Sequence, residues 1–252
     1  MAQNERNLSL EAAPEQIHEP LRLLAEKVII GLGENLQSIT VVGSSLTEDF
    51  KAGQSDVNTV LVLGKQTVAV LNTVAGLAKS MSKKKISPPL LMTPSYIERS
   101  LDVFGVEFLD FQLTHQTVLG DDPFAALSFN KGDVRLQCER ELKATLIRLR
   151  QGYIAAAANK KLVRDVLIST AKGLAPLVRA MLWLKDKDRP RRAESTFNKA
   201  ADELSINMGP VASAGKWRHE KVHLSEAEME NAFESVYSAV EELARIVDAL
   251  EV

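Results

Sequence analysis

The residues best able to do chemistry lie between two apolar runs. The first run ends in Gly43-Ser44, and after eleven intervening residues Asp56 and Asn58 stand two apart at the head of the second. Strand side chains alternate, so Asp56 and Asn58 would share one face while Val57 turns into the sheet. Gly43 would let the backbone turn sharply, leaving amides and the Ser44 hydroxyl free to meet a phosphate. We therefore expect phosphate contacts at this turn.

This layout resembles the nucleotidyltransferase superfamily that includes DNA polymerase β and kanamycin nucleotidyltransferase. The superfamily signature is an apolar residue, Gly-Ser or Gly-Gly, a spacer of about this length, then Asp-apolar-Asp or Asp-apolar-Glu. The resemblance implies transfer of a nucleoside monophosphate from an NTP to a hydroxyl or similar acceptor, with Mg²⁺ or Mn²⁺ as cofactor. It implies that Gly43, Ser44 and Ser45 contact the triphosphate. It also implies that Asp56, Asn58 and a third acid on a later strand hold metal.

The third acid is expected on a strand over residues 106–112. Glu107 and Asp110 would point to opposite faces of that strand, so only one of them can join the site. Antibiotic adenylyltransferases of this superfamily carry an apolar-Glu-apolar strand there, which favours Glu107 as the partner of Asp56 in catalysis and metal binding. Asp110 is the alternative. His115 follows this strand and could approach the site, although an isolated histidine is more often structural.

Asn58 departs from the superfamily pattern. Its amide offers one oxygen and no charge, whereas Mg²⁺ favours hard anionic ligands. The chain is then either an enzyme with a single strong metal site or a catalytically inactive module that binds a nucleotide or a protein. In a third interpretation Asp56 and Asn58 only cap a turn. The acceptor, whether small molecule, protein or RNA, is not specified by these residues.

The elements that position these residues form a small α/β (α+β) domain. Apolar spacing predicts an amphipathic helix beginning near Pro20, and helices over 67–82 and 94–99. Strands are expected over 38–43, 57–63, 88–93 and 106–112, which gives a mixed sheet. We place this nucleotidyltransferase-like domain at 17–130, after a flexible arm over 1–16.

The remainder, 131–252, is expected to be an all-α helical bundle. Helices are predicted over 133–157 with Asp133 as N-cap, from Asn159 with a kink or break at Pro176, and over 194–204. A loop is expected over 207–215. The last helix begins at Ser225 with a capping box, and its apolar stripe recurs in steps of four and three. That stripe could pack inside the bundle or against a second copy, so a homodimer through the bundle is possible.

A second motif, His219-Glu220-x-x-His223, matches the zinc metalloprotease pattern. On a helix the two histidines would share one face and bind zinc, with Glu220 as general base. The capping box at Ser225 starts a fresh helix, however, which leaves both histidines in the preceding loop with no evident third ligand. We therefore expect surface residues here, with a metalloprotease as a remote alternative.

Composition narrows the class of protein. Of the 252 residues 45% are hydrophobic and 25% are charged, which is typical of a globular fold rather than of a disordered chain. The single cysteine, Cys138, excludes a disulfide framework and a cysteine zinc site. Uncharged apolar runs fall short of the about 20 residues that a bilayer span needs, and the polar start lacks a signal segment. We expect a cytoplasmic protein without a membrane partner.

Overall fold

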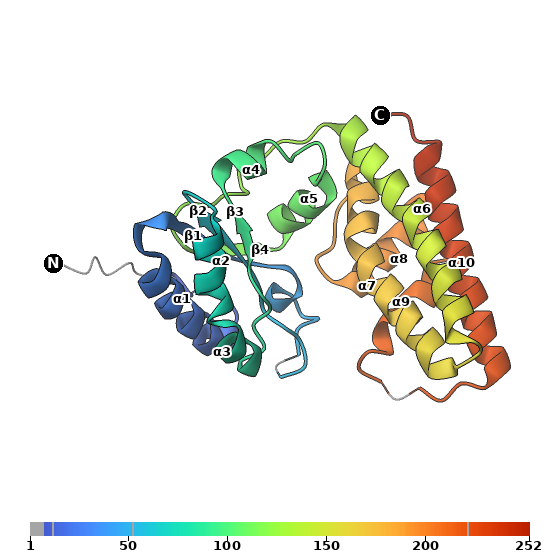
Figure 1. The fold of residues 1–252 in the computed structure, drawn as a ribbon. Coiled ribbons are helices and arrows are strands. Elements are labelled where there is room, and N and C mark those ends of the chain that lie inside the picture. The colour runs from blue at the N-terminus through green and yellow to red at the C-terminus, as the bar shows by residue number, and fades with distance from the viewer. Residues whose placement is uncertain (1–7, 12, 52, 221) are drawn as a thin grey trace. The chain divides into compact units, whose positions relative to one another are not determined.

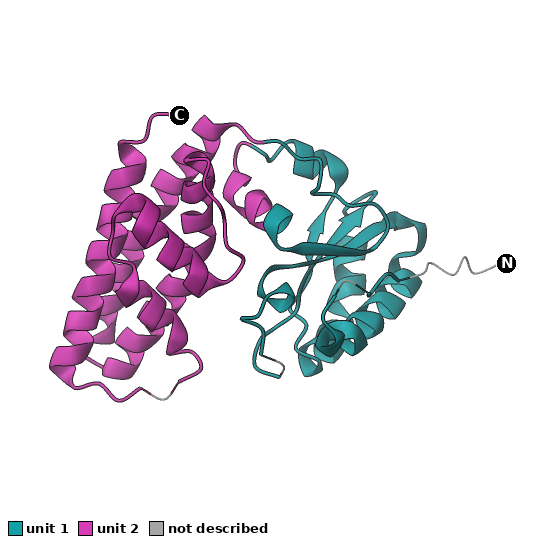
Figure 2. Ribbon diagram, turned by 180° about the vertical axis from the view of Figure 1, so that it is seen from behind, with its two compact units in different colours: residues 1–101, 111–128 teal, residues 102–110, 129–252 magenta. Residues whose placement is uncertain are grey.

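A computed structural model describes residues 8–11, 13–51, 53–220 and 222–252. The described residues divide into two compact units, drawn in separate colours in Figure 2. The α/β unit comprises 1–101 and 111–128, and the helical unit comprises 102–110 and 129–252. A mixed sheet and a separate helical region confirm the expected fold class. The segment 102–110 is the exception, because it belongs with the helical unit although it precedes the expected boundary.

In the described part of the chain, the sheet has four strands in the order β3-β2-β1-β4. The strands are β1 (Leu36–Val42), β2 (Asn58–Leu63), β3 (Leu90–Met92) and β4 (His115–Leu119). The central strand β1 pairs antiparallel with both β2 and β4, and β2 pairs parallel with β3. Most residues of β1 and β2 are apolar, and Ile or Val recurs in both strands, which favours buried strands at the centre of the sheet.

Helices cover one face of this sheet. They are α1 (His18–Leu32), α2 (Val68–Ala75) and α3 (Ala78–Lys83), which gather beside the strands in Figure 1, whereas α4 (Pro94–Glu98) follows β3. Leu24, Val74 and Met81 from the three helices share a buried core with Ile39 and Leu61 of the sheet. Because strand side chains alternate, Ser38 and Thr40 on either side of Ile39 point to the other face.

The first described residues pack against the α/β unit. The Ser9 amide donates to the Val118 carbonyl at 2.9 Å, and the side chains of Leu10 and Ala13 are 6% exposed. The flexible arm expected over 1–16 is therefore wrong for its described part after residue 7, because apolar side chains there find a place in the core. Residues 1–7 of that arm lie outside the described residues.

Residues 106–112 are helical, so the strand expected there is wrong. They belong to α5 (Gly105–Leu113), and the unpredicted strand β4 follows it directly. Val106 and Leu109 stand three apart, which is helical spacing, and both are buried in the core of the helical unit. A Cβ on Gly105 would lie 2.9 Å from Cγ2 of Val134, so glycine permits the close packing at the start of α5.

The helical unit is the expected bundle. Besides α5 it contains α6 (Lys131–Ala156), α7 (Lys160–Leu184), α8 (Ala193–Leu204), α9 (Gly209–Lys216) and α10 (Glu226–Asp248). The stripe of α10 is buried inside this unit, and the Ser225 capping box is present. The N-cap of α6 is Asn130, whose side chain accepts the Asp133 amide, rather than Asp133 itself.

Two expectations in this unit concern prolines. Pro176 lies inside α7, which continues as one helix, so the break is excluded and the kink stays a prediction. The segment expected to be a loop over 207–215 contains α9, whose first turn holds Pro210. Proline suits the first turn of a helix because backbone N–H groups there have no acceptor within the helix, so the lack of an N–H costs nothing. Buried Val211 and Ala214 then hold the helix against the bundle.

Helix α7 is long and apolar enough to span a membrane by length and composition alone, which the sequence analysis did not anticipate. In this structure 56% of its most apolar window is buried. Leu174, Val178 and Met181 lie in the core of the helical unit. A helix that is apolar on most sides is typical of the centre of a bundle as well as of a membrane span.

Candidate functional site

The Gly43 turn places a short helical segment at the end of β1. Gly43 has a φ of +79°, a conformation that side chains disfavour, and its amide donates to the Thr114 carbonyl at 2.8 Å. The chain then enters the 3-10 helix η3 (Gly43–Leu46), where the Thr47 hydroxyl donates to the Ser44 carbonyl at 3.0 Å. A Cβ on Gly43 would lie 3.9 Å from Nδ2 of Asn58. The turn and the Asn58 side chain are therefore neighbours.

The two serines of this turn differ in accessibility. The Ser44 side chain is exposed, and Ser45 is fully buried. Among the described residues the Ser45 hydroxyl has no hydrogen-bond partner. The Ser44 hydroxyl, which was predicted to meet a phosphate, is therefore open to solvent, whereas the Ser45 hydroxyl is not.

Asp56 and Asn58 flank a buried residue, as predicted from strand alternation. The Val57 amide donates to the Lys85 carbonyl at 2.7 Å, and its carbonyl accepts from the Ser87 amide at 3.0 Å. Val57 is 1% exposed, whereas Asp56 and Asn58 are both exposed. The carboxylate and the amide therefore lie on the side of the strand opposite Val57.

His115 lies on the same side of the sheet as Asn58, although the sequence indicated only that it could approach the site. In the register of β1, Val42 stands opposite both Asn58 on β2 and His115 on β4. Directly opposed residues in antiparallel pairs place their side chains on one face. The signal was present in the run His-Gln-Thr-Val-Leu before Gly120, a short β-rich stretch that ends at a turn residue.

Asp122 holds the His115 ring. Its Oδ2 lies 2.8 Å from Nε2 of His115, while its Oδ1 accepts the amides of Phe124 at 2.9 Å and Ala125 at 3.2 Å. Nδ1 of His115 lies 3.3 Å from the Gln112 carbonyl. Partial burial alone would raise the pKa of Asp122, but the His115 contact and the two amides outweigh it, so that pKa lies below its ordinary value.

Glu107 is not brought beside Asp56 by strand pairing, because it stands on α5 in the helical unit. Its Oε2 accepts from Nε2 of Gln137 at 2.6 Å, and Oε1 of the same amide accepts the Val106 N–H at 2.9 Å. Glu107 and Asp110 were expected to point to opposite faces of a strand, so that only one could join the site. On a helix this does not apply, because residues three apart lie near one another. Asp110 pairs with Arg179, whose Nε lies 2.6 Å from Oδ1.

Glu107 also faces a hollow and a thiol in the helical unit. A hollow of about 450 Å³ is lined by Glu107, Glu141, Thr145 and Arg148 together with residues of α7. Burial, with the Glu107 charge as a smaller contribution, raises the pKa of Cys138 to about 12. The thiol therefore stays protonated and is no candidate nucleophile.

The donor set near the turn fits one hard cation better than two. Neither β3 nor β4 contains an acidic residue, and within the described residues no group of three or more His, Cys, Asp or Glu could hold a metal. What remains is the Asp56 carboxylate, the Asn58 amide oxygen and the Ser44 hydroxyl. Mg²⁺ is commonly bound through one or two carboxylates together with substrate phosphates, so this set fits a single ion that arrives with a nucleotide.

The alternative zinc motif does not lie on a helix. His219 stands in the turn that follows α9, and His223 in the irregular segment before α10. The shared helical face that a zincin needs is therefore missing, as expected from the capping box at Ser225.

Comparison with known proteins identifies the fold. No protein-family model matches the chain, and no curated protein sequence matches it. Among solved structures, it is similar to spectinomycin adenyltransferase AAD(9) from Enterococcus faecialis, crystallised with ATP and spectinomycin. The match has a TM-score of 0.58 and 11% sequence identity, and covers 89% of this chain and 99% of the adenyltransferase. The chain therefore has the fold of this adenyltransferase.

Proposed function

We propose that this protein transfers a nucleoside monophosphate from an NTP, with ATP the first donor to test, to a hydroxyl of a small molecule. One observation carries the proposal: the Gly43 turn lies beside Asn58, with the exposed Asp56 carboxylate on the same side of the strand. The similarity to an adenyltransferase crystallised with ATP and spectinomycin supports an NTP donor and a small-molecule acceptor.

Each residue of the turn has a distinct role in this proposal. The Ser44 hydroxyl donates to a phosphate oxygen, and Ser45 contributes its backbone amide, since its side chain is buried. Gly43 leaves room for the phosphate to approach the backbone, which a side chain at this positive φ would obstruct. The Asn58 side chain donates an N–H to the same phosphate or coordinates a cation through its amide oxygen.

The reaction proposed here depends on Mg²⁺ or Mn²⁺. Asp56 holds the ion, Asn58 is the weaker ligand, and the bound ion would neutralise charge at the α-phosphate. Glu107 as the third acid stays a prediction, because it belongs to the helical unit, where its Oε2 accepts from Gln137.

A second candidate function is nucleotide binding without transfer. The observation that favours it is the donor set itself: Asn58 replaces the second acid, and the strands next to β1 and β2 supply none. Such a module would still bind a triphosphate through the Gly43 turn. It would release no pyrophosphate.

The test is pyrophosphate release from ATP with Mg²⁺ and a panel of hydroxyl-bearing acceptors that includes spectinomycin. Transfer predicts acceptor-dependent release that Asp56→Ala reduces by about 100-fold or more, because removing a metal ligand removes charge stabilisation of the transition state. Glu26→Ala, which changes an exposed acid of α1, is the matched control. ATP binding without release under every acceptor supports the second function, and undiminished release by Asp56→Ala contradicts the assigned site.

A further inference from the structure

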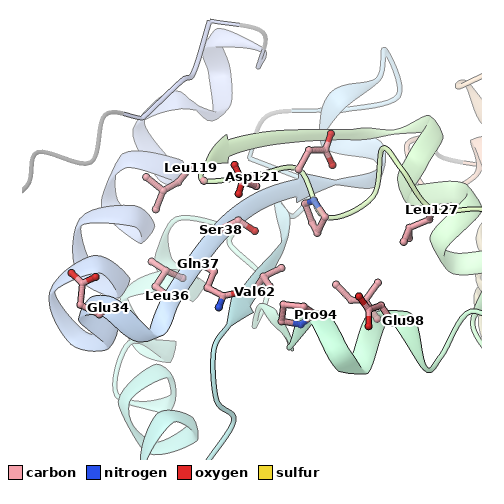
Figure 3. A pocket seen from close by; sticks show the side chains of 14 residues that line it. Glu34, Leu36, Gln37, Ser38, Val62, Pro94, Glu98, Leu119, Asp121 and Leu127 are labelled. Carbon is pink, nitrogen blue, oxygen red and sulfur yellow. The ribbon is translucent and has the colours of Figure 1, made fainter.

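A larger hollow lies in the α/β unit, at the other end of β1 from the Gly43 turn. It encloses about 760 Å³ and is shown in Figure 3. Its walls come from the start of β1, the end of β2, α4 and the segment that follows β4. Ser38 on its floor is five residues from Gly43 along β1, roughly 17 Å at about 3.3 Å per residue. The hollow is therefore separate from the proposed nucleotide site, and its volume suits a small organic ligand.

The Ser38 hydroxyl is the first sign that the hollow receives a ligand. Ser38 is 2% exposed, and its Oγ has no hydrogen-bond partner among the described residues. In Figure 3 this hydroxyl is directed into the hollow. The neighbouring like-facing residue Thr40 instead pairs its hydroxyl with that of Thr117 at 2.9 Å. The hydroxyls of Ser45 and Thr59 are likewise buried without a partner among the described residues, but only Ser38 borders the hollow. A buried hydroxyl without a partner is unfavourable, and a ligand group would relieve it.

The charge of the lining is the second sign. Its ionisable side chains are all acidic, with no lysine, arginine or histidine among them: Glu34, Glu98, Asp121 and Asp122. Asp122 already accepts from His115 and from two backbone amides. Asp121 and Glu98 stand on different walls, the first on the segment after β4 and the second on α4. Both side chains are exposed, and together they make the hollow attractive to a cation.

The rest of the lining is largely apolar. Leu36, Val62, Pro94, Leu119 and Leu127 provide hydrocarbon surface around the polar groups. An inorganic cation would gain nothing from that surface, and a phosphate would be repelled by the carboxylates. Organic ligand sites combine such an apolar lining with a few convergent polar groups.

We propose that this hollow binds a small organic cation, an amine on an apolar body. Its ammonium group lies between Asp121 and Glu98, its body contacts the apolar wall, and a polar atom of the ligand pairs with Ser38. Asp122 links the hollow to His115 and hence to the sheet face that carries Asn58, so occupancy of the hollow bears on the proposed nucleotide site through one hydrogen bond. Binding itself does not require the proposed transferase activity.

The test compares phenethylamine with phenethyl alcohol, which has the same apolar body and no charge, by isothermal titration calorimetry at neutral pH. The amine is expected to bind saturably and the alcohol at least about tenfold more weakly, since a hydrogen bond to a charged group contributes that much. Asp121→Asn combined with Glu98→Gln is expected to reduce amine affinity by about tenfold or more. Glu26→Gln is the control, because Glu26 is exposed and does not line the hollow. No saturable amine binding, or equal binding of the alcohol, overturns the proposal.

Ser38→Ala separates the hydroxyl from the charges. Removing a buried hydroxyl that lacks a partner is expected to raise the melting temperature of the free protein. The same variant is expected to weaken the binding of tyramine, whose phenol can pair with Ser38, more than that of phenethylamine. A lower melting temperature would mean that Ser38 is already satisfied in the free protein, which overturns its assigned role. Equal loss for the two amines would overturn the pairing of Ser38 with the ligand.

Discussion

At the scale of single residues, we expect Asn58 to determine how strongly the proposed site at the Gly43 turn holds a metal-bound nucleotide. Its amide lies next to Gly43, and Asp56 supplies the neighbouring carboxylate. Two spaced acids would bind a divalent ion through two charges, whereas this chain has one. The number of ligand charges is a main determinant of affinity for hard cations.

Replacing Asn58 with Asp should therefore strengthen Mg²⁺-dependent nucleotide binding. We expect Asn58→Asp to lower the Mg²⁺ concentration needed for half-maximal ATP binding by about tenfold, because an added carboxylate increases the ligand charge available to a hard cation. Calorimetric ATP titrations at several Mg²⁺ concentrations would measure this change. Asn72→Asp, on the exposed side of α2, introduces the same charge away from the turn. Equal effects of the two variants would mean that only net charge matters.

Cys138 should be unreactive while the protein is folded. Burial and the nearby Glu107 raise its pKa to about 12, so thiolate is scarce at pH 8 and the sulfur is shielded. Ellman's reagent should modify one thiol rapidly in urea and almost none in buffer. Glu107→Gln should lower this pKa in the folded protein, because it removes the negative charge, while burial still protects the thiol. Rapid modification of the native protein would contradict the packing of α6.

At the scale of elements, α5 is anchored to the helical unit by a buried ion pair. Asp110 and Arg179 have side chains 12% and 10% exposed, with Nε and Oδ1 2.6 Å apart. Removing one member leaves the other charge buried without its partner, which is strongly unfavourable.

Asp110→Ala should accordingly lower the free energy of unfolding by about 3 kcal/mol. Urea denaturation followed by circular dichroism would measure it. The matched control is Asp248→Ala, which breaks the exposed pair with Lys143 and should cost much less, because exposed ion pairs contribute little to stability. If the two losses were equal, the Asp110 pair would have to be solvated rather than buried.

The loss of folding stability at acidic pH should depend on Asp122, in the segment after β4. The pKa of Asp122 is lowered in the folded protein, so the contribution of its ionised form is fully present above 3.8, the ordinary value. That contribution is lost as the pH falls below 3.8 and through the depressed folded pKa. Asp122→Asn should be less stable than wild type at neutral pH, and the difference should shrink over this acidic range. Melting curves between neutral pH and pH 3 would show it, and a constant difference would contradict the contact with His115.

The strands of the sheet centre, together with α1, β3 and α4, were predictable from sequence, whereas α5 and β4 were not. Apolar β-branched runs defined β1 and β2, and with them Gly43, Asp56 and Asn58. Residues 106–112 carry signals of both periods: Val106 and Phe108 flank Glu107, as in a strand, while Val106 and Leu109 are three apart, as in a helix. Contact with the helical unit decides in favour of a helix, and no local signal carries that information. Because residues 106–112 were predicted as a strand, Glu107 was placed in the sheet rather than on α5. For the same reason β4, which begins at His115 two residues after α5 ends, was not predicted.

At the scale of the whole molecule, each unit has its own buried core, and the described residues contain no metal cluster that either core needs. A metal is thus expected to act only together with a nucleotide. Binding to the folded state stabilises it by RT ln(1 + [L]/Kd), about 2.7 kcal/mol at a ligand concentration 100 times Kd.

Thermal unfolding with and without EDTA tests this expectation. EDTA should leave the melting temperature of the nucleotide-free protein unchanged, because folding itself requires no ion. ATP with Mg²⁺ should raise the melting temperature, EDTA should remove most of that increase, and Asp56→Ala should lack it. An increase that survives EDTA would favour the nucleotide-binding module over the transferase, since the phosphates would then be held by the Gly43 turn without an ion. A fall in the nucleotide-free protein on adding EDTA would instead reveal a structural metal, and Asp56 would then have to be reconsidered as a ligand to a resident ion.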